Sequence, residues 1–137
     1  AEHATFFDPH VTYGMVAVYE PILLMRRMPF GEVVRMALTG NSERMSAETA
    51  RQVGLVSEVV PSGELADGAQ RLAAGIAAQP RRAVQATLRT LWAARDMTGA
   101  QATDIGNAFL QLGFSREDLT EGQEGFKSGK RIEPRIR

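Results

Sequence analysis

The sequence predicts a mixed α/β fold in which helices dominate, with short strands and about six helices. Two observations predict it. Beyond Pro61, apolar residues recur at helical spacing in one segment after another, whereas residues 55–60 are β-branched and bounded by glycine and proline, like a strand. A single strand cannot form a sheet. The chain is therefore either a nearly all-helical domain with one extended segment or a part whose strand pairs with a sheet supplied elsewhere.

The first 28 residues show no regular pattern. We expect residues 5–7 to end a strand and the Asp-Pro-His sequence of residues 8–10 to form a turn, because proline fixes its own φ and biases the preceding residue away from helix. A short helix or a loop is expected around residues 22–27. Pro29 suits the first position of the next helix, which should run to about Leu38 and end at Gly-Asn.

Helix signals dominate from residue 46 onwards. Ser46 is expected to cap a short helix that ends before Gly54, and the predicted strand at residues 55–60 follows. Four longer helices should come after Pro61. Their signals are, in order, an apolar stripe from Leu65 to Ile76, an opening proline at position 80, apolar residues 105, 109 and 112, and a sequence at 115–118 that resembles a capping box.

Composition excludes several classes of protein. A chain of 137 residues with 44% hydrophobic and 23% charged residues is typical of one soluble globular domain. Sixteen basic and sixteen acidic residues create no field that would recruit nucleic acid or an anionic membrane. There is no cysteine, and the two histidines lie in no metal-ligand spacing. No apolar run, including residues 22–25, is long enough to cross a bilayer, so we expect a cytoplasmic protein.

Residues 35–67 carry the most specific pattern in the chain. Leu-Thr-Gly at 38–40, Ser-Ala at 46–47, Gly-Leu-Val at 54–56 and Val-Val-Pro at 59–61 together resemble a segment of the enoyl-CoA hydratase/isomerase, or crotonase, superfamily. Residues 1–10 and the Asp-Leu-Thr-Glu-Gly sequence at 118–122 extend the resemblance in the right order.

This resemblance implies a C-terminal part of a crotonase-like fold, because the segment lies in the second half of longer family chains. Residues 1–61 would end the core, and residues 62–137 would form helices that assemble the oligomer and partly cover the acyl-CoA. The strand at 55–60 would then pair with an N-terminal fragment or segment. A homotrimer or hexamer is expected.

The family's catalytic groups are only partly represented. Its oxyanion hole uses two backbone N–H groups, and both would lie upstream of Ala1. Of its two acid–base glutamates, one would lie upstream and the second would fall at position 10, where this chain has His10. The family's glycine-rich loop aligns with residues 17–21, which contain no glycine. We therefore expect no catalysis by this polypeptide alone.

Two residues are catalytic candidates. His10 has the position and the near-neutral titration suited to a general acid or base; the alternative is a turn histidine bonded to backbone. Glu20 would approach the thioester if the altered loop folds back; the alternative is that it flanks the following helix.

Two further groups of residues are candidates for binding. Tyr13, Met15, Tyr19 and Met25 could line an acyl pocket, although simple core packing is the preferred interpretation. Near the C-terminus, the resemblance assigns Phe126 and Lys130 to the adenine and phosphates of CoA, with Lys127 or Arg131 as substitutes. The alternative there is a solvated basic tail.

Three functions remain open from sequence. The first is an acyl-CoA-binding lyase or isomerase that works through an enolate, with acyl-CoA as substrate and no cofactor. The second is a non-catalytic relative that binds acyl-CoA as a carrier or regulator. The third is a helical oligomerisation module without a ligand, since the apolar stripes beyond Pro61 exceed what one small core needs.

Overall fold

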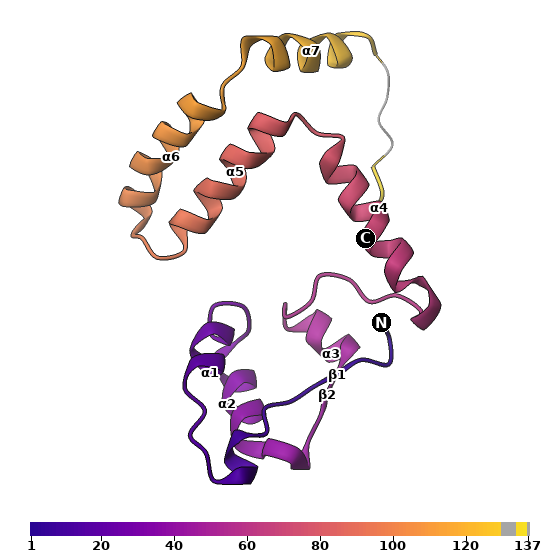
Figure 1. Ribbon diagram of the computed structural model, residues 1–137, viewed down its shortest axis with the longest axis vertical. Helices are drawn as coiled ribbons and strands as arrows, with labels where there is room; N and C mark the ends of the chain where they lie inside the picture. The colour runs from indigo at the N-terminus through magenta and orange to yellow at the C-terminus, as the bar shows by residue number, and fades with distance from the viewer. Residues whose placement is uncertain (130–133, 137) are drawn as a thin grey trace. The chain divides into compact units, whose positions relative to one another are not determined.

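A computed structural model describes residues 1–129 and 134–136 (Figure 1). The chain divides into two compact units, Ala1–Ala69 and Gln70–Arg137. The boundary falls inside helix α4, Leu65–Ala77. The division predicted at residue 61 stays a prediction.

Short elements make up the first unit. In chain order they are β1 (Thr5–Phe6), the 3-10 helix η1 (His10–Tyr13), α1 (Tyr19–Leu24), α2 (Phe30–Thr39), the 3-10 helix η2 (Gly40–Ser42), β2 (Met45–Ser46), α3 (Ala47–Gln52) and the 3-10 helix η3 (Ser62–Glu64). Strands β1 and β2 are antiparallel, with Thr5 opposite Ser46 and Phe6 opposite Met45. The strand expected near residue 5 is therefore confirmed, whereas residues 7–9 have no regular assignment and His10 begins η1.

The core of the first unit is small and centred on α2. Met28, Val33 and Met36 are buried, and Phe6, Leu24, Met45, Val53 and Leu55 pack against them. Val33 and Met36 are one helical turn apart, so both lie on the same face of α2. Helix α3 adds two buried alanines, and Ala50 is fully inaccessible to solvent.

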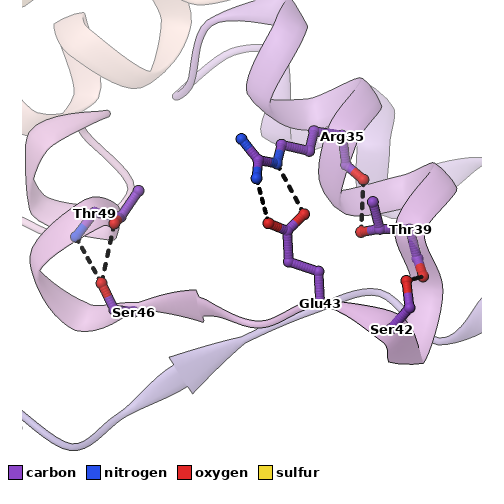
Figure 2. Close-up of polar contacts among 6 residues, drawn as sticks. All are labelled: Arg35, Thr39, Ser42, Glu43, Ser46 and Thr49. Carbon is purple, nitrogen blue, oxygen red and sulfur yellow. Dashed lines mark hydrogen bonds and ion pairs between the residues drawn. The ribbon is translucent and has the colours of Figure 1, made fainter.

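Local capping explains where α3 begins and ends. The Ser46 hydroxyl accepts a hydrogen bond from the Thr49 backbone N–H at 3.1 Å, as an N-cap side chain should (Figure 2). Gly54 follows the helix with a φ of +84°, a conformation that favours glycine. Both ends of the predicted helix are confirmed.

The prediction of a strand at residues 55–60 is wrong for this structure. The N–H groups of Leu55 and Val56 both donate to the Ala50 carbonyl and so close the end of α3. At the other end of the segment, the Val60 carbonyl accepts from the Glu2 N–H at 2.9 Å. A strand requires a ladder of such bonds along its length, and in the described residues no neighbouring strand supplies one here.

The second unit contains helices throughout its described length. After α4 come α5 (Arg81–Ala94), α6 (Gly99–Gly113) and α7 (Arg116–Lys127). Helices α5 and α6 lie side by side (Figure 1). A capping box between Thr98 and Gln101 starts α6, and the Ser115 hydroxyl accepts from the Asp118 N–H at 3.2 Å to start α7. The four helices predicted beyond Pro61 are confirmed.

Close packing of α5 against α6 depends on Gly113. A Cβ at this position would lie 2.3 Å from the Ala86 Cβ, far inside van der Waals contact.

The mostly helical α/β fold is confirmed, with two short strands and seven α-helices among the described residues. No helix in that part of the chain is long and apolar enough to cross a membrane.

Candidate acid–base site

His10 is held against a buried carboxylate. Its Nδ1 lies 2.6 Å from Oδ1 of Asp8, and its backbone N–H donates to the same oxygen at 3.0 Å. Asp8 is 5% exposed, whereas the imidazole keeps 28% of its surface accessible. Because an ionised carboxylate only accepts hydrogen bonds, Nδ1 must carry the hydrogen in this contact. The imidazole is therefore fixed at one nitrogen, and the other nitrogen is left to exchange a proton.

The turn that carries His10 is anchored to the segment after α2. The Thr12 hydroxyl accepts from the Asn41 backbone N–H at 2.8 Å, and the Asn41 side-chain amide donates to the Tyr13 hydroxyl at 3.4 Å. Gly14 ends η1 at a φ of +69°, where it donates its N–H back into the turn. A glycine suits position 14 because the chain needs a positive φ there to end η1.

The contact shifts the pKa of both partners. The hydrogen bond to Asp8 raises the pKa of His10; burial opposes this, and the negative charges of Asp8 and Glu20 add to it. For Asp8, burial alone would raise the pKa. Its two hydrogen bonds to His10 and the charge of the imidazolium outweigh burial, and the net pKa is lowered.

Stability should therefore depend on pH through this pair. His10, with its pKa raised above the ordinary 6.5, contributes stability that is fully present below that pH and is lost as pH rises through the raised pKa. Asp8, with its pKa lowered, contributes above the ordinary 3.8 and loses its contribution as pH falls through the lowered value. The pair stabilises the fold most between these two ordinary values.

Urea unfolding of the wild type and His10→Gln across pH measures this contribution. We expect the free energy of unfolding to differ most at about pH 5.5, and the difference to shrink by about pH 9. An equal difference at both pH values would contradict the pairing.

Glu20 lies close enough to influence His10 by charge. It sits in the first turn of α1, where a carboxylate also favours the positive end of the helix dipole. Its side chain is exposed. Both the catalytic and the helix-flanking interpretation of Glu20 therefore stay open.

The predicted core role of Tyr13, Met15, Tyr19 and Met25 is wrong for the described structure. Their exposed fractions are 66%, 51%, 78% and 45%. None of the four belongs to the buried cluster of this unit or to the side chains packed against it. These side chains instead form part of an exposed apolar surface, which leaves the acyl-pocket interpretation available.

An ion pair between Arg35 and Glu43, called the brace below, links α2 to the segment that precedes β2 (Figure 2). Arg35 donates from Nε to the Glu43 carboxylate at 2.8 Å and from a terminal nitrogen to its second oxygen. The Thr39 hydroxyl donates to the Arg35 carbonyl at 2.8 Å. A hollow of about 210 Å³ lies beside the brace. Arg35 and Glu43 satisfy each other in a two-point contact, and Arg44, which also lines the hollow, lies over the Phe7 ring.

A larger apolar groove lies in the second unit. It has a volume of about 780 Å³ and is lined by residues from Pro80 and helices α5, α6 and α7, among them Leu91, Leu110, Phe114 and Leu119. Lys127, at the end of α7, also lines it. The apolar stripes of these helices were predicted from sequence, but their convergence on one hollow was not.

The predicted CoA-binding residues lie at the end of α7 and beyond it. Phe126 belongs to α7 by its backbone, and Lys130 and Arg131 lie outside the described residues. The assignments of Phe126 and Lys130, with Arg131 as a substitute, stay predictions.

Within residues 1–129 and 134–136, no cluster of three histidine, aspartate or glutamate side chains is arranged to hold a metal ion.

Asp8 is the residue that sequence reasoning missed. The signal was present, since Asp-Pro-His places a carboxylate two residues before the imidazole, a spacing typical of a side chain that bonds to backbone two residues on. A helix-rich α/β chain that holds an imidazole against a buried carboxylate is equipped for proton transfer.

The sequence profile of the enoyl-CoA hydratase/isomerase family matches residues 1–133. Two relatives illustrate the match. The (E)-benzylidenesuccinyl-CoA hydratase of Thauera aromatica is 38% identical over 115 residues, covering 83% of this chain and 43% of that protein. An enoyl-CoA hydratase of Mycobacterium tuberculosis is 31% identical over 105 residues, covering 77% of this chain and 39% of that protein.

A solved structure agrees with these relatives. The enoyl-CoA hydratase/isomerase from Mycobacterium paratuberculosis superposes with a TM-score of 0.87 at 33% identity. The chain therefore belongs to the enoyl-CoA hydratase/isomerase family. The superposition covers 99% of this chain and 54% of that one, and the first curated relatives are matched over 32% to 43% of their length.

Proposed function

We propose that this chain supplies the acid–base wall of an acyl-CoA hydratase or isomerase site, with His10 as the group that moves the proton at the carbon next to the thioester. The observation that carries the proposal is the imidazole of His10, partly exposed and 2.6 Å from a buried carboxylate. Family membership supports the substrate class, because the relatives' names specify enoyl-CoA and benzylidenesuccinyl-CoA thioesters.

In hydration, the oxygen of water bonds to the β-carbon while that water gives up a proton to a base. The electrons of the double bond move toward the thioester oxygen and form an enolate. When the enolate collapses, the imidazolium of His10 delivers a proton to the α-carbon and becomes neutral. The proton taken up by the base is then released to solvent and His10 takes up a proton again, so the net change is addition of one water; the reverse reaction runs through the same enolate. This chemistry needs no cofactor.

The enolate also needs hydrogen-bond donors directed at the thioester oxygen. We propose that two backbone N–H groups outside residues 1–137 supply them, together with the base that activates water. The exposed side chains of Tyr13, Met15, Tyr19 and Met25 would then line the acyl chain or pack against that remaining part of the protein. Phe126 and Lys130, with Lys127 as a substitute, would contact CoA.

Assembly is part of the same proposal. Leu91, Leu110 and Phe114 are 60%, 63% and 55% exposed around the groove of the second unit. Faces of this kind mark contacts between proteins. We propose a homotrimer or hexamer in the cytoplasm, and light scattering that gave a monomer for the whole protein would contradict this.

The test follows hydration of crotonyl-CoA by the loss of absorbance from the double bond that is conjugated with the thioester. The whole protein in which these residues occur should hydrate it. Residues 1–137 alone should be slower by at least about 10²–10³-fold, the usual effect of losing a single oxyanion donor. Robust hydration by residues 1–137 alone would contradict the division of the site. No turnover by the whole protein would contradict the function.

The alternative is a non-catalytic acyl-CoA-binding or oligomerisation protein of the same fold. The observation in its favour is the absence of glycine from residues 17–21, where the family's loop is expected. Calorimetric titration with crotonyl-CoA separates the two. Binding by the whole protein without turnover would favour this alternative.

A further inference from the structure

Asp8 carries a charge that the proposed reaction does not use directly. It is 5% exposed, and burying a carboxylate is costly unless it is paired and hydrogen-bonded. Its Oδ1 accepts both bonds from His10, while in the described part of the chain Oδ2 is buried without a hydrogen-bond partner. The imidazole is therefore the group that compensates the buried charge.

We infer that Asp8 is a positioning residue for His10: its carboxylate holds the hydrogen of the imidazole on Nδ1 and leaves Nε2 as the nitrogen that exchanges a proton with the acyl-CoA. The inference rests on the proposed function and adds to it the reactive atom and the group that selects it. Asp8 itself would touch neither the substrate nor the reacting atoms.

The geometry selects one orientation of the ring. The backbone bond at 3.0 Å fixes the carboxylate relative to the turn, and the bond at 2.6 Å fixes Nδ1 relative to the carboxylate. The ring has little freedom to flip, because a flip would take the Nδ1 hydrogen away from the buried carboxylate of Asp8 and leave that charge without its side-chain donor. A fixed tautomer is what a proton carrier needs before the substrate arrives.

Other charges near the ring do not replace Asp8. The negative charge of Glu20, in α1, also raises the pKa of His10, but the hydrogen bond to Asp8 is the larger cause. Helices α2 and η2 pack against the turn. The charged residues there are Glu32 and Arg35, and Arg35 is paired with Glu43. Asp8 is the carboxylate in direct contact with His10.

The experiment uses the whole protein with its histidine rings labelled with ¹⁵N. The His10 signal is assigned by its absence in His10→Gln. In the wild type, neutral His10 should carry its hydrogen on Nδ1. In Asp8→Asn, which keeps the shape and an accepting oxygen but loses the charge, the pKa of His10 should fall toward its ordinary value.

Turnover supplies the second readout. In Asp8→Asn, kcat/KM for crotonyl-CoA should fall by at least roughly 10- to 100-fold, the range seen when a carboxylate that orients a metal-bound imidazole is lost. The limb of the pH profile that reports His10 should move to lower pH together with the pKa seen by NMR. Asp8→Glu should recover part of both. A merely structural role would lower activity without moving the limb.

The outcomes separate the inference from the function on which it rests. Neutral His10 protonated on Nε2, or a His10 pKa unchanged in Asp8→Asn, would overturn the positioning role even with full turnover. The tautomer is measured on the wild type, so the first of these results does not depend on whether Asp8→Asn folds. Absent turnover with the expected NMR result would overturn the proposed function and, with it, any catalytic meaning of the pair.

Discussion

Replacing His10 with glutamine should lower kcat/KM of the whole protein for crotonyl-CoA by about 10²–10⁴-fold, the usual contribution of a general acid or base. Glutamine retains a polar side chain of similar reach and can donate a hydrogen bond to Asp8, but it cannot carry a proton to carbon near neutral pH. The fold should survive, since the imidazole is partly exposed and outside the core cluster. Steady-state hydration kinetics measure the effect.

His3 provides the matched control. It is the other histidine of the chain, it is exposed, and it bonds at 2.7 Å to the Ser62 hydroxyl. His3→Gln should leave kcat/KM within about threefold of the wild type, because surface substitutions away from a site have small effects. Equal losses in the two variants, or no loss in His10→Gln, would remove His10 from the mechanism.

Gly40→Ala should strongly destabilise the first unit. Gly40 is buried and has a φ of +56° and a ψ of −130°, a region open essentially to glycine alone. A Cβ there would also lie 2.2 Å from the Thr12 hydroxyl oxygen. Strain of this kind costs about 1–3 kcal/mol, and the displaced Thr12 adds to it. Urea unfolding should show the loss.

Gly31→Ala tests the same chemical change without either problem. Gly31 is exposed in the first turn of α2, and nothing lies within 4 Å of a Cβ built on it. Alanine favours helix over glycine by up to about 1 kcal/mol, so this variant should be neutral or more stable. Gly40→Ala as stable as Gly31→Ala would contradict the close packing of Gly40 against Thr12. Because Thr12 belongs to η1, Gly40→Ala should also lower activity through His10.

The helices were predictable because their signals are local. Ser46 and Gly54 bracket α3, and the sequence at 115–118 starts α7, each through bonds that span three residues or fewer. Apolar spacing beyond Pro61 then suffices to locate the rest. These features depend on neighbours in the sequence and not on the rest of the fold.

The errors concern contacts between distant residues. Residues 55–60 have strand composition, but a strand exists only when another strand pairs with it, and composition does not specify the partner. Tyr13 and Tyr19 were assigned to a core from their residue type, yet their burial depends on which element covers them. Family resemblance gave His10 its candidate role; the spacing of Asp8 before His10 is visible in the sequence, but the burial that makes their contact important is not.

Exchange of hydrogen at the carbon next to the thioester tests the central claim most directly. The whole protein is incubated with butyryl-CoA in D₂O, and deuterium in the recovered thioester is measured by mass spectrometry. We expect deuterium to enter at the α-carbon with the wild type and at least about 10²-fold more slowly with His10→Gln. Exchange at the same rate in both proteins, or none in the wild type, would contradict a role for His10 in forming the enolate.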